Sequence, residues 1–318
     1  MMKKNFSDKT SKVYIAGHRG LVGSAIHRAL LAKRYTNFVL KTSQELDLRN
    51  EKEVEMFFEK EKPDFVFVAA AKVGGIKANM DFPAEFIYDN LKIQNNVINS
   101  SWKNNVSKLL FLGSACIYPT QAKQPIKEEY LMTGPFEPTN QPYGVAKMAG
   151  IEMCRAYRKQ YGCNFISAIP NNLYGTGDNF HPDNSHLVAA LIRKFHEAKI
   201  NNKKEVMLWG TGTPRRELLY ADDAAEACVL LMEKYNEGDI VNVGLGEDRS
   251  VKEIAEVVKG VVGFDGEISF DTTKPDGMMH RLLDVSKIRT LGWKANTPLD
   301  EGIKKSYEWF LENVANKQ

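Results

Sequence analysis

Residues 12–23 read Lys12-Val13-Tyr14-Ile15-Ala16-Gly17-His18-Arg19-Gly20-Leu21-Val22-Gly23. The first five form a short apolar segment typical of a strand, and residues 21–33 have the pattern of a helix. The glycines between them have the spacing G-x-x-G-x-x-G, which permits a tight turn and lets backbone N–H groups approach a diphosphate at the helix N-terminus. This arrangement predicts a dinucleotide-binding site formed by Gly17, His18, Arg19, Gly20, Leu21, Val22 and Gly23.

The same alternation of strand and helix continues to residue 170. The apolar patterns predict strands at residues 38–40, 64–71, 108–113 and 164–169, and helices at residues 51–60, 82–104 and 143–161. The run 64–71 is almost continuously apolar, as expected of a strand covered on both faces. Strands that alternate with helices form right-handed βαβ units, so the sequence predicts a Rossmann-type, doubly wound parallel sheet.

The pattern loosens in the second half of the chain. Residues 171–186 are rich in Gly, Pro, Asn and Asp and predict a loop. A strand at residues 205–209 and helices at residues 185–199, 222–235, 251–262 and 299–313 follow. We therefore expect a Rossmann domain over residues 11–170, with a returning segment near residues 212–245. A smaller, interleaved α/β substrate domain is expected over residues 171–211 and 246–318.

The bulk composition narrows the class of protein. Of 318 residues, 43% are hydrophobic and 26% charged, and the net charge is only +3, which fits a globular protein without a nucleic-acid partner. Residues 1–12 are polar, and no stretch approaches the roughly 20 apolar residues that cross a bilayer. We expect a cytoplasmic protein with no membrane partner. Its cysteines should be reduced, and none has zinc-type spacing; they are Cys116, Cys154, Cys163 and Cys228.

The charges near the second predicted strand bear on the choice of cofactor. An NAD site usually places an acidic residue after this strand, where it accepts a hydrogen bond from the ribose 2′-OH. Here Lys41 follows the strand, and Arg19 lies in the glycine loop. Two cations suit the 2′-phosphate of NADP, so NADP(H) is expected over NAD. Asp47 either lies against the adenine or caps the helix that begins near Glu51.

A Y-x-x-x-K pair predicts the catalytic centre. Tyr143 and Lys147 are four residues apart on a predicted helix and so share one face. A neighbouring ammonium lowers the pKa of a phenol, which would let Tyr143 exchange a proton with a carbonyl oxygen, while Lys147 also holds the nicotinamide ribose. Ser114 comes directly after the fourth strand, at the sheet edge where open α/β sheets bind ligands, and could stabilise an oxyanion there.

Several longer segments carry a resemblance to a known family. The chain resembles the GDP-L-fucose synthases, a branch of the extended short-chain dehydrogenase/reductases that modify nucleotide sugars. The resemblance covers residues 12–312 and is strongest at residues 17–23, 69–76, 113–119, 170–175, 178–182 and 209–212. It implies conversion of GDP-4-keto-6-deoxy-D-mannose to GDP-L-fucose by 3,5-epimerisation and NADPH-dependent reduction at C4.

The resemblance also implies roles for individual residues. Cys116 and His186 are implied to be the acid and base of epimerisation, and a thiol and an imidazole both exchange protons near neutral pH. Further cofactor contacts are implied for Ala70, Pro170, Asn171, Asn172, Leu173 and His186. Substrate contacts are implied for Lys194, Trp209, Arg216, Asp276 and Arg281. Similar proteins form homodimers through the helices at residues 82–104 and 143–161, so a homodimer is expected here.

Two other classes of function remain open. The first is another family member, an NAD-dependent nucleotide-sugar 4-epimerase or 4,6-dehydratase. A dehydratase would carry an acidic pair just after Ser114, where this chain has Ala115 and Cys116. The second is a non-enzymatic NADP-binding regulator, which usually lacks the tyrosine or the lysine that are both present here.

Overall fold

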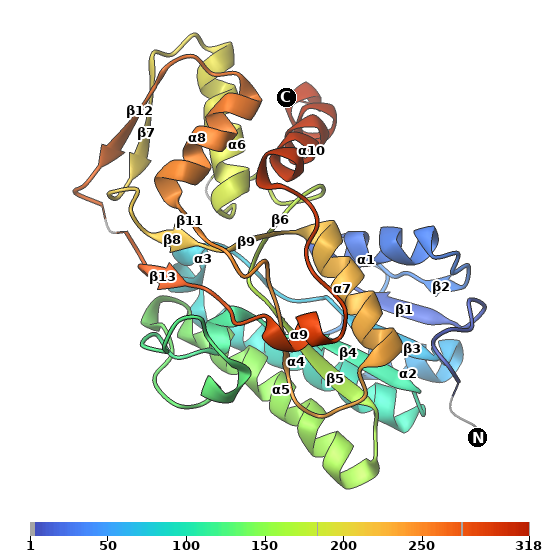
Figure 1. Cartoon of the computed structure of the whole chain (residues 1–318). Helices are drawn as coiled ribbons and strands as arrows, with labels where there is room; N and C mark the ends of the chain where they lie inside the picture. Colours follow the sequence, from blue (N-terminus) through green and yellow to red (C-terminus); the bar gives the residue numbers. More distant parts are fainter. Residues whose placement is uncertain (1–3, 183, 275, 318) are drawn as a thin grey trace.

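A parallel sheet of six strands forms the centre of the computed structural model, which describes residues 4–182, 184–274 and 276–317 (Figure 1). The strand order is β10-β5-β4-β3-β1-β2, and every neighbouring pair is parallel. The strands are β1 (Val13–Ala16), β2 (Phe38–Val39), β3 (Phe65–Val68), β4 (Lys108–Leu112), β5 (Phe165–Pro170) and β10 (Val241–Val243). The predicted doubly wound parallel sheet is confirmed, although β3 is shorter than the apolar run 64–71.

The order of strands reverses between β1 and β3. From β1 the chain moves to β2 on one side, and it then returns to β3 on the other side. At such a switch point the loops after the two strands separate and leave a crevice for a ligand. Here the loop after β1 contains Gly17, and the loop after β3 contains Ala70. A Cβ placed on Gly17 would lie 2.7 Å from the backbone N of Ala70, so only glycine allows this approach.

Helices cover both faces of the sheet (Figure 1). On one face α1 (Leu21–Ala32) packs against α7 (Ala221–Lys234), whose first turn carries Asp222 and Asp223 as expected for a helix N-terminus. On the other face α4 (Pro83–Lys103) packs between α2 (Glu51–Glu61) and α5 (Gln141–Tyr161). The strands between these layers are almost completely buried, as in β3, where all four residues are buried.

Glycines allow α5 to lie very close to β4 and α4. A Cβ on Gly150, in the middle of α5, would lie 2.7 Å from the Phe111 ring and 2.9 Å from the Gln94 side-chain oxygen. Gln94 in turn donates a hydrogen bond to the backbone oxygen of Ala146 in α5, at 2.7 Å. The two long helices are therefore tied to each other and to β4 at a fixed separation.

A second group of helices and strands lies above the carboxyl edge of the sheet (Figure 1). It contains α6 (Leu187–Ile200), α8 (Val251–Val262), α10 (Leu299–Asn313) and the paired strands β7 (Glu205–Trp209) and β12 (Glu267–Asp271). These elements enclose their own cluster of buried apolar side chains, which includes Phe195, Val258 and Ile303. A capping box of Ser250 and Glu253 begins α8, and Gly263 ends it in the left-handed conformation.

Short elements connect the two layers of the molecule. Strand β6 (Asn172–Tyr174) pairs with β9 (Leu218–Tyr220), and β8 (Arg215–Arg216) lies between β11 (Arg249–Ser250) and β13 (His280–Arg281). The helices α3 (Ile76–Asp81) and α9 (Ser286–Thr290) complete the fold. The short strands among these elements and β10 were not predicted, because strands of two or three residues contain too little alternation to recognise. The helices α3 and α9 and the five-residue strand β12 were not predicted either. The predicted loop at residues 171–186 thus contains β6, and residue 183 lies outside the described residues.

All four cysteines are free, as expected, and Cys154 and Cys228 are buried. Among the helices of the described chain, none has the length and apolar character needed to span a membrane. Residues 1–3 of the polar amino-terminal stretch lie outside the described residues.

Two glycine-to-alanine substitutions, one in α5 and one in α8, should change the free energy of unfolding in opposite directions. Gly150→Ala places a methyl group against Phe111 and should lower the free energy of unfolding by about 1–3 kcal/mol. Gly260→Ala in α8 meets no atom within 4 Å, so it should raise that free energy by up to about 1 kcal/mol through helix propensity alone. Urea unfolding measures both, and equal stabilisation by the two substitutions would contradict the packing described here.

Candidate active site

The end of β4 and the start of α5 bring three predicted catalytic residues together. After β4 the chain forms a short 3-10 turn, Ala115–Ile117, with Ser114 at its start. A Cβ on Gly144 would lie 2.9 Å from the backbone oxygen of Cys116, so the first turn of α5 lies directly against this turn. The Ser114 hydroxyl accepts a hydrogen bond from the Cys116 backbone N–H at 3.3 Å and also hydrogen bonds to the Tyr143 phenol.

Lys147 lies one helical turn below Tyr143 and is buried. Its ammonium donates a hydrogen bond to the backbone oxygen of Leu112 at 2.8 Å. The Nζ atom is 4.9 Å from the centre of the Phe111 ring and 5.9 Å from the centre of the Tyr143 ring. Desolvation lowers the pKa of Lys147 to about 8, because burial disfavours the charged form. Lys147 therefore stands beside Tyr143, as the helical spacing predicted.

The lowered pKa that the sequence predicted for the Tyr143 phenol is wrong. Burial raises the pKa of Tyr143, the nearby Cys116 sulfur raises it further, and the hydrogen bond with Ser114 opposes both effects. The sequence predicted the opposite direction, because it indicated the neighbouring cation but not the loss of water around the phenol.

The Cys116 sulfur faces two donors from other segments. Asn140, just before α5, directs its amide Nδ2 to the sulfur at 3.2 Å. Arg281, at the end of β13, directs its Nη1 to the same atom at 3.7 Å. The structure thus joins the predicted residues Cys116 and Arg281, which are 165 positions apart in sequence. The sequence analysis did not find Asn140; a polar side chain directly before the Tyr143 helix was the available signal.

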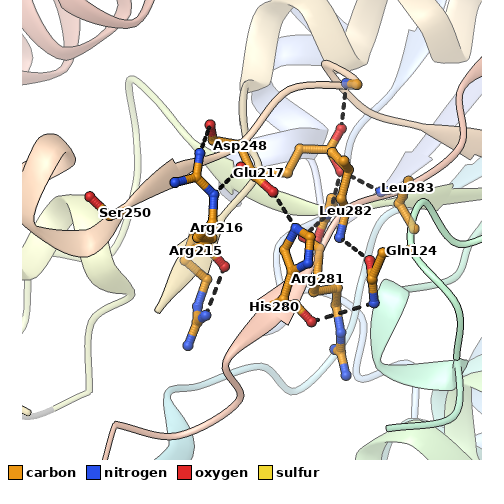
Figure 2. Close-up of polar contacts among 12 residues, drawn as sticks. Gln124, Arg215, Arg216, Glu217, Asp248, Ser250, His280, Arg281, Leu282 and Leu283 are labelled. Atoms are coloured by element: carbon orange, nitrogen blue, oxygen red, sulfur yellow. Dashed lines mark hydrogen bonds and ion pairs between the residues drawn. The ribbon is translucent and has the colours of Figure 1, made fainter. Parts of the chain in front are cut away.

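The register of two short strands creates a pair of neighbouring arginines. Strands β8 and β13 run parallel, with Arg215 opposite His280 and Arg216 opposite Arg281. Side chains alternate along a strand, so the two pairs face opposite sides. Figure 2 shows Arg215 extending to Asp248, which also contacts His280, while the guanidinium groups of Arg216 and Arg281 extend to the other side.

The arginine pair has little compensating negative charge. Arg281 is buried, and its Nε and Nη2 atoms have no hydrogen-bond partner in the described part of the chain. Desolvation and the charge of Arg281 lower the pKa of Arg216, against the attraction of Asp276. Buried charges of the same sign are costly unless an anion joins them. The geometry therefore fits a diphosphate, whose oxygens can accept from both guanidinium groups.

The three other predicted substrate residues are Trp209, Asp276 and Lys194, and of these Asp276 acts electrostatically on Arg216. Trp209, at the end of β7, is 66% exposed and offers an open ring face. Asp276 accepts hydrogen bonds from the backbone N–H and hydroxyl of Thr211, at 2.7 and 2.9 Å, which fixes it beside the turn that follows Trp209. Lys194 lies exposed in α6, and no hydrogen bond or ion pair among the described residues ties it to the other predicted residues.

The glycine loop, residues 17–23, lies at the switch point, where the sequence predicted a dinucleotide-binding site; we call this loop the cradle. The Gly20 N–H donates to the Gly17 carbonyl at 3.0 Å, and a Cβ on Gly23 would overlap the same carbonyl oxygen. The His18 ring hydrogen bonds to the backbone of Lys41, and its Nδ1 is buried with no hydrogen-bond partner among the described residues. Desolvation lowers the pKa of His18. The loop after β1 and the segment after β2 therefore meet, as a dinucleotide site requires.

Two charged residues of this region form ion pairs with other side chains that the sequence did not predict. Arg19 is exposed, whereas Lys41 forms an ion pair with Glu45 at 3.6 Å. Asp47 forms an ion pair with Arg49 at 2.9 Å, and this bond holds the pKa of Asp47 low. The alternative role of Asp47 as a helix cap is wrong, because α2 is capped by Asn50, which accepts from the Glu53 N–H.

The segment after β5 lies between the cradle and the arginine pair. Pro170 ends β5, and Asn172 and Leu173 belong to β6. Asn171 is buried and donates hydrogen bonds through its side chain to the Glu217 carboxylate and to the backbone oxygen of Arg281. His186 is an exposed residue at the N-terminus of α6. No contact among the described residues joins His186 to Cys116.

Comparisons with known proteins agree with this arrangement. The model of the NAD dependent epimerase/dehydratase family matches residues 13–244. A putative GDP-L-fucose synthase 2 of Arabidopsis thaliana is 56% identical over 98% of this chain and 95% of its own length. The structure of a GDP-L-fucose synthetase from Naegleria fowleri bound to NADP has a TM-score of 0.90 at 29% identity, covering 96% of this chain and 95% of that one. A GDP-6-OMe-4-keto-L-xylo-heptose reductase from Campylobacter jejuni has the same TM-score at 43% identity, covering 96% and 99%.

Alanine substitutions at two glycines of the cradle should impair the protein in different ways, one through NADPH binding alone and the other also through fold stability. A Cβ on Gly20 lies 3.4 Å from the Gly17 carbonyl oxygen, so Gly20→Ala should fold with a stability within about 0.5 kcal/mol of wild type. The methyl group nevertheless blocks the approach of a diphosphate and should weaken NADPH binding by about tenfold or more. Gly23→Ala should also destabilise the fold, by about 1–3 kcal/mol, because the overlap is with backbone.

Fluorescence titration with NADPH and thermal unfolding separate the two effects. Unchanged NADPH affinity in Gly20→Ala would contradict the position assigned to the dinucleotide.

Proposed function

The chain belongs to the NAD-dependent epimerase/dehydratase family, and we propose that it converts GDP-4-keto-6-deoxy-D-mannose to GDP-L-fucose with NADPH. The observation that carries this proposal is the clustering of Cys116 with Ser114 and Tyr143, next to Arg281, whose Nη1 contacts the Cys116 sulfur. Such a cluster combines the groups for reduction of a ketone with a further proton-exchanging group. The alternative of an NAD-dependent 4-epimerase or 4,6-dehydratase is not favoured.

NADP(H) is the cofactor that suits the cradle. The glycines leave room for the diphosphate, and Arg19 and Lys41 lie where a 2′-phosphate would be held, once Lys41 exchanges Glu45 for the phosphate. When bound, NADPH supplies the hydride that reduces C4. Ala70 borders the cradle, and the segment 170–173 follows β5 at the same sheet edge. His186 stands at the N-terminus of α6 and is assigned to the cofactor's nicotinamide end as well as to catalysis.

The residues around Tyr143 handle the reduction. Ser114 and Tyr143 hydrogen bond to the substrate's C4 oxygen and stabilise the negative charge that develops there. The phenol then gives its proton to this oxygen. The Lys147 ammonium, fixed by Leu112, stabilises the resulting phenolate and holds the ribose of the nicotinamide. Bound substrate displaces water from a phenol that is already largely desolvated, which strengthens these interactions.

Cys116 and His186 handle the epimerisations. The C4 ketone makes the protons on C3 and C5 acidic, and one of the two residues removes such a proton while the other returns one to the opposite face of the ring. The same Ser114 and Tyr143 donors stabilise the enolate, so the sugar stays in one site for all steps. Since Cys116 is partly accessible and faces Asn140 and Arg281, its thiol is directed into the substrate site.

The nucleotide diphosphate binds along the second half of the chain. Arg216 and Arg281 clamp the phosphates, and Lys194 reaches the same region from α6. Trp209 stacks on the base. The Asp276 carboxylate accepts hydrogen bonds, and guanine carries two adjacent N–H donors, so this carboxylate favours guanine.

The proposal extends to assembly and location. A homodimer through α4 and α5 is supported by a hollow of about 410 Å³ between the starts of these helices, lined mainly by apolar residues. Its lining is Pro83, Ala84, Ile87, Pro138, Gln141, Pro142 and Val145. A cytoplasmic location fits the four free cysteines, because cytosolic thiols stay reduced.

A direct assay tests the proposed reaction. Purified protein mixed with NADPH and GDP-4-keto-6-deoxy-D-mannose should consume NADPH, seen by absorbance, and yield GDP-L-fucose, identified by NMR. Cys116→Ser and His186→Asn should each slow inversion at C3 and C5 by about 100-fold or more, since each removes a proton-transfer group. Cys163→Ser, a cysteine outside the site, is the matched control and should keep the wild-type rate.

Other outcomes of the assay identify other activities. NADPH consumption that yields a sugar not inverted at C3 and C5 would contradict the proposal and indicate a simple C4 reductase, and heptose substrates would then be tried. Absence of NADPH consumption, with NAD retained on the purified protein, would indicate a 4-epimerase.

A further inference from the structure

The buried carboxylate of Glu217 is hydrogen bonded to the segment after β5, which is assigned to the cofactor, and to a segment next to the two arginine strands. Glu217 follows Arg216 and is 0% exposed. Its carboxylate accepts hydrogen bonds from the backbone N–H groups of Gly246, at 2.6 Å, and Leu283, at 2.9 Å, and from the side chain of Asn171. Figure 2 shows Glu217 beside Leu283. Gly244 permits this approach, because a Cβ there would lie 2.9 Å from the carboxylate carbon.

This carboxylate is expensive to bury. Desolvation raises the pKa of Glu217, and the hydrogen bonds from backbone N–H groups and Asn171 oppose the rise. Its hydrogen-bond donors among the described residues are uncharged, and Arg281, which lies opposite Arg216 in the β8–β13 pair, directs its guanidinium to Cys116 instead. A buried charge held only by neutral donors contributes less stability than a well-packed apolar side chain would. Its position between binding segments therefore calls for a role besides stability.

The segments that hydrogen bond to Glu217 are assigned to the binding of different ligands. Asn171 follows β5, at the sheet edge assigned to the cofactor. Leu283 lies two residues after Arg281, and Glu217 itself directly follows Arg216, so both arginine strands end at this carboxylate. Asn171 also donates to the backbone oxygen of Arg281 at 3.4 Å. A displacement of Asn171 must therefore move, or be resisted by, the strands that hold the two arginines.

We propose that Glu217 is a positioning residue that couples binding of the dinucleotide to binding of the nucleotide sugar. This inference rests on the proposed function, since it takes the ligands to be NADP(H) and a GDP-sugar. Dinucleotide held at the segment after β5 fixes Asn171, Glu217 and the arginine strands in one arrangement. The diphosphate then meets guanidinium groups that are already ordered, and it binds more tightly because less ordering remains to be done.

Calorimetric titration of GDP into the protein, with and without saturating NADP⁺, measures this coupling. Wild type should bind GDP about fivefold or more tightly when NADP⁺ is present. Glu217→Gln keeps the shape but turns an amide N–H₂ toward the N–H donors of Gly246 or Leu283. It should bind GDP more weakly and bring the ratio of the two affinities close to one.

A matched control separates coupling from loss of stability. Asp223, in the first turn of α7, is also a buried carboxylate, and it accepts from the backbone N–H and hydroxyl of Thr297 at 2.9 and 3.0 Å. Asp223→Asn should lower the melting temperature as Glu217→Gln does, yet keep the wild-type affinity ratio. If Glu217→Gln does not fold, Asn171→Ser can be used, because it removes the amide donor from the same carboxylate. It should likewise bring the ratio of GDP affinities with and without NADP⁺ close to one.

The outcomes distinguish this inference from the proposed function. A wild-type ratio of one with both ligands bound, or a wild-type ratio retained in Glu217→Gln, overturns the coupling role and leaves the proposed reaction intact. Failure of the wild-type protein to bind GDP or NADP⁺ at all contradicts the proposed function and the coupling together.

Discussion

The close packing of α5 against β4 and the turn that follows it is the constraint on which the site depends. Gly144 and Gly150 remove the side chains that would hold α5 away, and contact with Cys116 and Phe111 follows. At this separation Lys147 reaches the backbone of Leu112 and Tyr143 reaches Ser114. Wider spacing by the length of one methyl group would break both hydrogen bonds, whose strength falls steeply with distance. Tyr143 and Lys147, both on α5, are thus positioned by a rigid element.

The second constraint is electrostatic and comes from the register of β8 and β13. One face of this pair is neutralised by Asp248, while on the other face Arg216 and Arg281 form no ion pair with any acid among the described residues, although Asp276 attracts Arg216. Leaving two guanidinium groups partly desolvated and close together costs stability in the free protein. In the proposed function a bound diphosphate recovers that cost, so the free energy of this unfavourable arrangement becomes affinity for the substrate. Because Arg281 also contacts Cys116, the proposed phosphate clamp and the proposed catalytic cluster adjoin each other.

Local sequence predicted the features that depend on local chemistry. The glycine loop, the βαβ order and the Tyr143–Lys147 pair rest on spacing along one element, and the structure contains all three. Contacts between distant segments were not predictable: Asn140 and Arg281 at Cys116, the pairing of β8 with β13, and the hydrogen bonds of Glu217. The direction of the Tyr143 pKa was predicted wrongly for the same reason, since desolvation depends on the whole packed core. Lys41 was recognised as a cation, but its partner Glu45 was not.

The central claim is that one site exchanges protons at C3 and C5 and reduces C4. The most direct measurement is to run the reaction in D₂O with protonated NADPH and to locate deuterium in the product by NMR. We expect GDP-L-fucose carrying deuterium at both C3 and C5 and protium at C4. We also expect the Cys116→Ser variant to give little or no deuterium at either carbon. A reduced product that lacks deuterium at C3 or C5 with the wild-type protein, or wild-type labelling in Cys116→Ser, would contradict it.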